Sequence, residues 1–509
     1  MTIVSSSTLS PQENLDCDVV VVGSGAAGSV VAAELAASGL RVIVLEEGPH
    51  VPQSEYRNYR PSQSLRKLWR NAAMTVAIGM GNSPTINVTM GRCIGGSSVL
   101  TGGVCFRTPE AVLDHWAGTL GLSDLTPDRM APFFDEVEST IKVTTVPEDM
   151  RSEGIRLFEE GAAKSGLSLS PLKRNTHQCK GCGRCNFGCP KGAKLSVDVT
   201  FLPRAVRDGA QVISDARVHR IQHEGRQVCG VTVHKLDPMK RVTGSFNVSA
   251  KRVLLAAGAM HTPLLVQKSL GKKLKHVGRN ITFHPSFRMI ARFDQEIRGW
   301  KGALQSAYSK DFEQDRMTLV GLFVPPGVLA ATMPGFGPAH TDRAKQIPNM
   351  AMFGGLIHDE GGGILRGGLG SEPIVTYRMS PEDRAAVPLL LKRMAKTFIN
   401  AGAQEVFIPV LGHEPIAATH FNSVDFDRIP LKRLECASQH PLGSCRMGTH
   451  ENSSAVSENG QMWGIKGLYV ADGSVIPTSL GVNPQVTVMT MALRIGRRLA
   501  ETVQPSPWV

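Results

Sequence analysis

The sequence predicts a mixed α/β protein, and three observations carry that prediction. A β-branched run at residues 19–22 leads into a glycine-rich turn and a helical stretch that ends at Gly39, which is the pattern of a βαβ unit. Alternating stretches between residues 286 and 431, such as PIVTYRMS, suit an antiparallel sheet. The chain has 509 residues, of which 42% are hydrophobic and 20% charged, so it is long enough for more than one globular unit.

Composition and charge exclude other classes of protein. The 56 Lys and Arg residues outnumber the 44 Asp and Glu residues, but they are scattered and do not form a basic stripe with aromatic residues, so nucleic-acid binding is not predicted. The N-terminus lacks the pattern of a signal peptide. The most apolar stretch, residues 19–45, carries Glu34, Arg41 and four glycines, so no transmembrane segment is predicted. We therefore expect a cytoplasmic protein that can still contact a membrane surface peripherally.

The first glycine-rich turn, GSGAAG, has the spacing of a dinucleotide-binding site. Gly23 suits the tight turn, Gly25 lets the backbone approach a pyrophosphate, and Gly28 allows close packing of helix and strand. A second buried strand is expected at residues 41–45, and Glu46 after it can accept the ribose hydroxyls. The alternative is a glycine-rich turn without a ligand. The motif by itself does not distinguish FAD from NAD.

Further motifs indicate a family. GRCIGGSSVLTGG covers residues 91–103, ASQHPLGSCRMG covers residues 437–448, and a segment beginning GLYVADGSV covers residues 467–501. With these segments the sequence resembles the glucose–methanol–choline (GMC) oxidoreductase family over nearly its whole length. It is similar to cholesterol oxidases, long-chain alcohol oxidases and bacterial FAD-dependent alcohol or sugar dehydrogenases. Thr101 departs from this pattern, because many members have Asn there.

The resemblance implies that FAD is the cofactor and that its domain is discontinuous. A Rossmann-like FAD-binding domain is expected to be assembled from distant segments, and a substrate domain is expected to have an antiparallel sheet roofed by helices. The predicted ranges are 15–110, 195–285 and 432–509 for the FAD-binding domain, 111–194 for a connecting segment with a cysteine-rich loop at 179–190, and 286–431 for the substrate domain.

The resemblance also adds cofactor-binding residues outside the first turn. These further residues are Gly91, Gly95, Gly96, Ser97, Val218 and Asp472. Asp472 is expected to anchor backbone next to FAD and not to take part in the chemistry.

Two residues are predicted to be catalytic. His440 matches the base of the family, and Asn483 matches a position that holds either His or Asn. A neutral imidazole can take the hydroxyl proton of an alcohol while hydride moves from carbon to flavin N5, and an amide can orient the alcohol oxygen. His284 and His450 are expected to have structural roles.

Four cysteines form a separate motif, C-x2-C-x2-C-x3-C-P, at Cys179, Cys182, Cys185 and Cys189. This spacing equals the cysteine run of bacterial ferredoxins, and it predicts an iron–sulfur cluster of the 4Fe–4S or 3Fe–4S type. The resemblance adds support, because the bacterial FAD glucose dehydrogenases carry a cluster in this part of the chain. A zinc site, disulfides and free cysteines are the alternatives.

These observations predict an FAD-dependent dehydrogenase or oxidase that acts on CH–OH donors. The apolar segment 322–340 suits a substrate lid, a membrane-touching loop or a core loop, and the low aromatic content disfavours a sugar site. We therefore expect a lipophilic primary or secondary alcohol as substrate. The electrons are expected to leave through the cluster to an external acceptor protein or a quinone. The alternatives are an oxidase that uses O2 without a cluster, a lyase or light-driven decarboxylase, and a non-catalytic electron-transfer protein.

Overall fold

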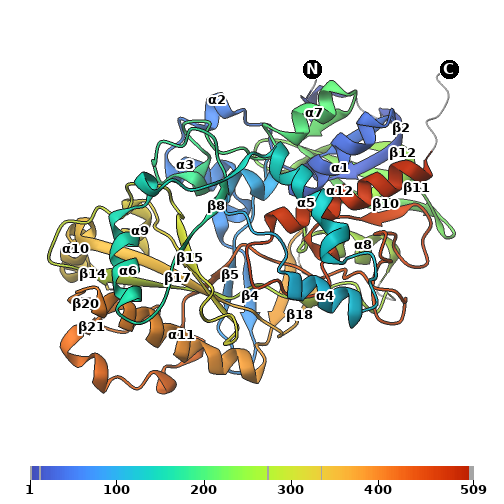
Figure 1. Cartoon of the computed structure of the whole chain (residues 1–509). Helices are drawn as coiled ribbons and strands as arrows, with labels where there is room; N and C mark the ends of the chain where they lie inside the picture. The colour runs from blue at the N-terminus through green and yellow to red at the C-terminus, as the bar shows by residue number, and fades with distance from the viewer. Residues whose placement is uncertain (1–2, 11–12, 272–273, 334, 369, 504–509) are drawn as a thin grey trace.

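Two β-sheets form the framework of the protein in a computed structural model that describes residues 3–10, 13–271, 274–333, 335–368 and 370–503. Figure 1 shows the first sheet at the right, next to helices α1 and α12, and the second sheet at the left, where strands β14 and β17 lie. The first sheet combines parallel strand pairs with an antiparallel run of three consecutive strands, whereas the second sheet is largely antiparallel. The predicted mixed α/β class is confirmed.

The first sheet contains the predicted βαβ unit. Strands β2 and β3 are parallel neighbours, and helix α1 (Ala26–Ala37) connects them. All four residues of β3 and the last six of β2 are buried, because both faces of a parallel sheet are covered. The sheet order is β1-β9-β3-β2-β12-β11-β10, and β23 pairs with β12. The bounds are β1 Ile3–Ser5, β2 Asn14–Val22, β3 Val42–Leu45, β9 Gln211–Ser214, β10 Ala216–Glu224, β11 Gln227–Leu236, β12 Val242–Leu255 and β23 Leu468–Val470.

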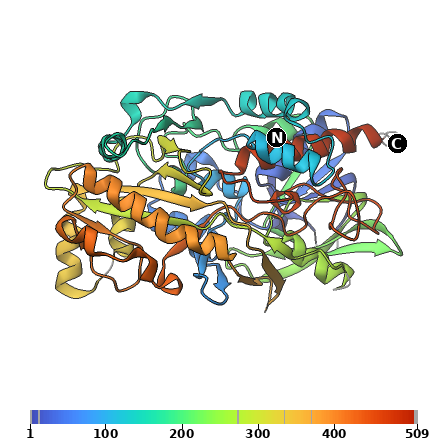
Figure 2. The same cartoon turned by 60° about the horizontal axis from the view of Figure 1, so that its bottom comes forward.

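The second sheet has thirteen strands. Its order is β13-β18-β19-β4-β5-β22-β14-β17-β16-β15-β7, with β20 pairing β14 and β21. Helix α11 (Pro381–Asn400) packs on this sheet and crosses it in Figure 2. The bounds are β4 Val76–Gly79, β5 Ile86–Val88, β7 Ser170–Pro171, β13 Arg279–Ile281, β14 Ser286–Arg292, β15 Ala307–Ser309, β16 Met317–Gly321, β17 Met350–Ile357, β18 Gly363–Gly367, β19 Pro373–Tyr377, β20 Glu405–Phe407, β21 Ile416–Ala417 and β22 Cys436–Ser438.

Strand pairing crosses the predicted domain boundaries. Strands β4, β5, β13 and β22 fall inside the ranges predicted for FAD binding, yet they pair within the second sheet. Strand β22 lies parallel to β5 and antiparallel to β14. The domain ranges stay a prediction, and the pairing shows that the two sheets exchange segments of chain.

The remaining elements surround the sheets. Helices α1 and α12 contact each other closely although they lie near opposite ends of the described chain, and Figure 1 shows them together. Among the described residues, no helix is both long enough and apolar enough to cross a bilayer. The apolar segment 322–340 contains α9 and the start of α10, and its Pro334 lies outside the described residues. The helix bounds are α2 Gln53–Tyr56, α3 Pro61–Lys67, α4 Glu110–Gly118, α5 Pro127–Thr140, α6 Glu153–Ala163, α7 Phe201–Arg207, α8 Thr262–Leu270, α9 Pro326–Thr332, α10 Gly337–Lys345 and α12 Gln485–Thr502, and a small sheet joins β6 Val143–Thr145 to β8 Lys173–Asn175.

Candidate active site

A cavity of about 1310 Å³ is lined by residues of both sheets. Most of the residues predicted for cofactor binding and catalysis reach it, although they come from segments that are far apart in the chain. Those on its wall are Gly23, Gly25, Glu46, Gly91, Gly96, Ser97, Val218, His440, Asp472 and Asn483. Gly28 and Gly95 do not belong to this wall and shape the backbone next to it.

The first glycine turn joins β2 to α1. Gly23 has a φ of +100°, and a Cβ atom there would lie 2.4 Å from the carbonyl oxygen of Ala256. A Cβ atom on Gly28 would lie 1.9 Å from the carbonyl oxygen of Gly23, so the helix packs directly on the turn. At both positions a hydrogen atom fits but a side chain does not, so both must be glycine, as in the dinucleotide-binding pattern.

Glu46 braces this turn. Its Oε2 accepts hydrogen bonds from the backbone N–H of Ser24 at 2.9 Å and from the Ser24 hydroxyl at 2.7 Å, and its Oε1 accepts from the N–H of Gly48 at 2.8 Å. Burial raises the pKa of Glu46. The carboxylate therefore holds the glycine turn in shape, and its predicted contact with a ribose stays a prediction.

The second glycine-rich loop meets the first. Gly95 and Gly96 have φ values of +85° and +53°, and a Cβ atom on Gly96 would lie 2.9 Å from the Cα atom of Gly25. Two loops from different parts of the chain thus approach each other through backbone alone. This close contact explains why both loops are rich in glycine.

Asp472 anchors a third backbone segment of the cavity wall. Its Oδ2 accepts hydrogen bonds from the N–H of Gly258 at 2.8 Å and from the hydroxyl of Thr262 at 2.5 Å, and its Oδ1 accepts from the N–H of Ser474 at 2.8 Å. Gly258 also lines the cavity. This arrangement agrees with the anchoring role expected for Asp472.

The two predicted catalytic side chains lie together. His440 follows strand β22, Asn483 lies just before helix α12, and the amide nitrogen of Asn483 is 3.1 Å from Nε2 of His440. Burial lowers the pKa of His440 to about 4, so its imidazole is neutral at pH 7. The Oδ1 atom of Asn483 is buried without a partner. A hydrogen-bonding group of a ligand at this point can therefore meet both side chains.

His284 contacts the other side of the His440 ring. Nδ1 of His284 lies 3.3 Å from Nδ1 of His440, and Nε2 of His284 accepts the backbone N–H groups of Leu480 and Gly481 at 3.0 and 3.1 Å. Because Nε2 accepts, neutral His284 carries its proton on Nδ1 and donates it to His440. Neutral His440 would then carry its own proton on Nε2, but the NH2 group of Asn483 can only donate to that atom, so the contacts of His440 with His284 and with Asn483 cannot both be hydrogen bonds of one neutral state. The structural role expected for His284 stays a prediction, and its contact with His440 is a feature that the sequence did not predict.

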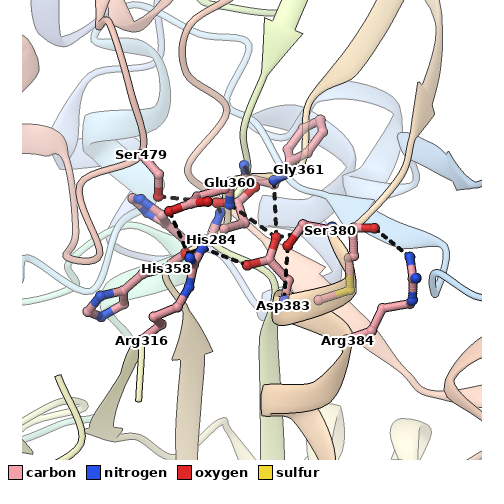
Figure 3. Close-up of polar contacts among 12 residues, drawn as sticks. His284, Arg316, His358, Glu360, Gly361, Ser380, Asp383, Arg384 and Ser479 are labelled. Atoms are coloured by element: carbon pink, nitrogen blue, oxygen red, sulfur yellow. Dashed lines mark hydrogen bonds and ion pairs between the residues drawn. The ribbon is translucent and has the colours of Figure 1, made fainter. Parts of the chain in front are cut away.

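Asp359 holds the backbone behind these histidines. Its two oxygens accept hydrogen bonds from four donors: the N–H of Phe283, the N–H of His284, the Tyr377 hydroxyl and the Ser479 hydroxyl. Burial raises the pKa of Asp359 to about 6. A second carboxylate, Asp383, accepts from the N–H groups of Glu360 and Gly361, and Figure 3 draws it in one view with His284 and Ser479. This polar layer fixes the residues that carry the catalytic candidates, and the sequence pattern gave no signal for it.

The cysteine-rich loop lies against the same cavity. Cys185 and Cys189 are buried, Cys179 and Cys182 are partly buried, and all four are free of disulfides. Asn186 and Phe187, from the same loop, line the cavity. Within the described ranges, no three His, Cys, Asp or Glu side chains are placed so that they could hold a single metal ion. The loop is therefore next to the predicted cofactor site, and its sulfurs do not form a closed single-ion site.

Two buried cations hold this loop. Arg174 donates from Nε to the carbonyl oxygen of Gly102 at 3.0 Å and from Nη2 to Sγ of Cys185 at 3.0 Å. Lys194 donates from Nζ to the carbonyl oxygens of Val99, Thr101 and Cys185 at 2.6, 2.8 and 3.1 Å. Burial lowers the pKa of Lys194 to about 8. Neither cation was recognised from the sequence, where both look like ordinary basic residues.

Comparison with known proteins identifies the family. Two models described as GMC oxidoreductase match residues 17–286 and 371–492. The chain belongs to the GMC oxidoreductase family. A protein described as an uncharacterized GMC-type oxidoreductase of Mycobacterium tuberculosis is 35% identical over 479 residues, which are 94% of this chain and 75% of that protein.

Two further proteins resemble this GMC oxidoreductase. Long-chain-alcohol oxidase FAO1 of Arabidopsis thaliana is 27% identical over an alignment of 526 positions that covers 96% of this chain and 67% of that protein. The structure of an R554K variant of formate oxidase from Aspergillus oryzae has a TM-score of 0.75 at 16% identity and covers 97% of this chain and 99% of that one. The second likeness shows the fold alone. Together with the glycine-rich cavity, family membership makes this protein an FAD-dependent oxidoreductase.

Proposed function

We propose that this GMC oxidoreductase oxidises a lipophilic primary or secondary alcohol whose oxygen is held by His440 and Asn483. The observation that carries the proposal is the 3.1 Å contact between Asn483 Nδ2 and His440 Nε2 on the wall of the cavity that the glycine loops also line. Both side chains can hydrogen-bond an oxygen, and both lie where the family places its catalytic groups. Resemblance to a long-chain-alcohol oxidase supports the class of substrate.

The residues around His440 determine how a proton can leave the alcohol. FAD, when bound, accepts hydride from the alcohol carbon. The low pKa of His440 keeps this residue neutral and able to accept the hydroxyl proton at pH 7. To accept at Nε2, His440 must carry its own proton on Nδ1, so its hydrogen bond with His284 has to loosen when the alcohol binds. We therefore assign His284 the role of setting the state of the base.

The composition of the cavity wall supports an apolar substrate. Apolar side chains from strands β14, β16 and β17, from the segment after β16 and from helix α9 lie on this wall: Phe287, Val320, Leu322, Phe323, Val328 and Leu356. Arg288 and Glu435 form an ion pair of 2.6 Å on the same wall and neutralise each other. A hydrocarbon chain can bury its surface against such a wall at about 25 cal/mol per Å².

Anaerobic absorption spectra of the FAD-loaded protein test this proposal. We expect alcohols of increasing chain length to bleach the flavin absorbance with increasing efficiency, and sugars to leave it unchanged. The same alcohols assayed under air distinguish an oxidase, which forms peroxide, from a dehydrogenase, which needs an added acceptor. Failure of every alcohol to bleach the flavin would contradict the proposal and favour a non-catalytic electron-transfer protein.

We also propose that Cys179, Cys182, Cys185 and Cys189 hold an iron–sulfur cluster. Bound there, it would pass electrons singly to an external redox protein or quinone. The ligands of a cluster bond different iron atoms and lie farther apart than those of one ion, which is compatible with the absence of a single-ion site among the described residues. The buried cations next to Cys185 also support an anionic occupant. The contents of iron and acid-labile sulfide, measured in anaerobically purified protein, test the proposal. A fully active protein without iron would contradict it and favour the alternative, an oxidase that uses O2 without a cluster.

A further inference from the structure

Arg174 and Lys194 are buried almost completely, at 0% and 1% exposure. Among the described residues, neither forms an ion pair with a carboxylate within 4.0 Å. The nearby carboxylate of Asp198 accepts hydrogen bonds from Ser196 and Tyr56 instead. A buried charge without a countercharge is costly, and proteins normally pair it or bind an ion there. Two such cations side by side therefore point to an anion that completes the site.

The hydrogen bonds of the two cations indicate where that anion lies. Both cations contact Cys185, Arg174 through the sulfur and Lys194 through the backbone carbonyl. The second terminal nitrogen of Arg174, Nη1, is buried without a partner. A donor in this position can bond a further sulfur or other acceptor that belongs to the occupant of the loop.

The same side chains connect the cysteine loop to the second glycine-rich loop. Lys194 bonds the carbonyls of Val99 and Thr101, and Arg174 bonds that of Gly102. Residues Thr101 and Gly102 line the cavity. Each cation thus bridges the wall of the FAD cavity and the ligand loop, so it can fix the distance between them.

We propose that Arg174 and Lys194 are the built-in countercharges of a thiolate-ligated metal–sulfur centre on Cys185 and its neighbours, and that they set its reduction potential. This inference rests on the cluster proposed above. Both residues are positioning residues, since they act through the sulfur ligands and the loop. Net charge and hydrogen bonds to sulfur are known determinants of cluster potentials. A positive charge nearby favours the reduced, more negative state, so loss of either cation is expected to lower the potential.

The test is a redox titration of the full-length FAD-loaded protein after anaerobic reconstitution with ferrous iron and sulfide. We compare Arg174→Gln and Lys194→Gln with the wild type, and Lys191→Gln serves as the control because Lys191 is an exposed lysine of the same loop. A fifth protein, Arg174→Lys, conserves the charge, and we expect a visible iron–sulfur absorption in all five. The midpoint potential of the centre is expected to shift to more negative values in Arg174→Gln and Lys194→Gln, and to stay at the wild-type value in Lys191→Gln and in the charge-conserving Arg174→Lys.

The outcomes separate this inference from the proposal on which it rests. Unchanged potentials in well-folded Arg174→Gln and Lys194→Gln with full iron content would overturn the inference and leave the cluster in place. Absence of iron from the reconstituted wild type would overturn both. The FAD content shows whether Arg174→Gln folds. If it does not fold, the inference is tested with Lys194→Gln and Arg174→Lys alone. A potential shift in Arg174→Lys as large as that in Lys194→Gln would contradict a role for charge.

Discussion

Two buried polar regions border the same cavity, and they are completed in different ways. Around His440, the buried groups are two imidazoles and a carboxylate, and backbone N–H groups and hydroxyls supply most of their hydrogen bonds, with Asp359 accepting four. Around Cys185, two cations are buried with no carboxylate paired to them among the described residues. In the first region the buried carboxylate has four donors and only Oδ1 of Asn483 is left without a partner among the groups described above, whereas in the second the two cations have no carboxylate within 4.0 Å among the described residues.

This difference indicates how each region functions. A network of satisfied hydrogen bonds holds a base in a fixed place before the substrate arrives. A cluster of uncompensated cations instead stabilises an occupant that brings negative charge with it. Variants of His440, Asp359 and His284 test the first region, and their contrast with the Arg174 and Lys194 variants tests the second.

The largest effect is expected from removing His440, one of the two residues predicted to be catalytic. His440→Ala is expected to reduce the rate of flavin reduction by alcohol about 10²–10⁴-fold, the usual contribution of a positioned base. Anaerobic stopped-flow absorbance measures this rate. The control is His450→Ala, since His450 is exposed. Equal rates in the two variants would show that His440 does not act in the reaction.

The second largest effect is expected from removing the carboxylate of Asp359. Asp359→Ala leaves the N–H groups of Phe283 and His284 and two hydroxyls without their acceptor. Each unsatisfied buried donor costs about 1–3 kcal/mol, so we expect the free energy of unfolding to fall by about 4 kcal/mol after partial relaxation. Urea denaturation measures the loss, and exposed Asp149→Ala is the matched control. A loss below that of the control variant would show that water replaces the carboxylate.

A smaller effect is expected at His284. His284→Phe removes the acceptor of two backbone N–H groups, and we expect a loss of about 2 kcal/mol in unfolding free energy. His284→Gln is expected to lose less, because its side-chain oxygen can accept one of these bonds. Thermal denaturation compares the two. A glutamine variant as unstable as the phenylalanine variant would mean that shape, and not hydrogen bonding, fixes this position.

The smallest effect comes from pH. Burial lowers the folded-state pKa of His440 and of His358 to about 4, compared with 6.5 for a free imidazole. Because the unfolded chain then takes up protons first, this contribution to stability is complete above about pH 6.5 and is lost as the pH falls towards 4. We expect a loss of about 1 kcal/mol per histidine between pH 7 and 5.5. Urea titrations at both pH values measure it, and His440→Gln should show a smaller difference.

Local pattern was sufficient to predict the nucleotide-binding part of the fold. The strand at 19–22, the glycine turn and the strand at 41–45 correspond to β2, the turn before α1 and β3. Their signal lies in consecutive residues, where buried strands and tight turns leave a direct mark on the sequence. The residues predicted for catalysis come from motifs that also identify the family, and their catalytic role stays a prediction.

The remaining features depend on contacts between distant segments, which limited their prediction from the sequence. The sequence of β4 and β5 contains nothing that assigns them to the second sheet, since their partners β19 and β22 lie hundreds of residues away. Arg174 and Lys194 are ordinary basic residues in the sequence, and only the fold shows that they are buried on Cys185. Asp359 likewise gains its role from four donors that converge from separate segments.

Gly23 and Asn483 both lie on the cavity wall, and α1 packs against α12. During synthesis, the glycine turn therefore leaves the ribosome long before the opposite wall exists. A nascent chain cannot enclose FAD until residues up to α12 have emerged and docked. Capture of the cofactor is for this reason a late step of biogenesis.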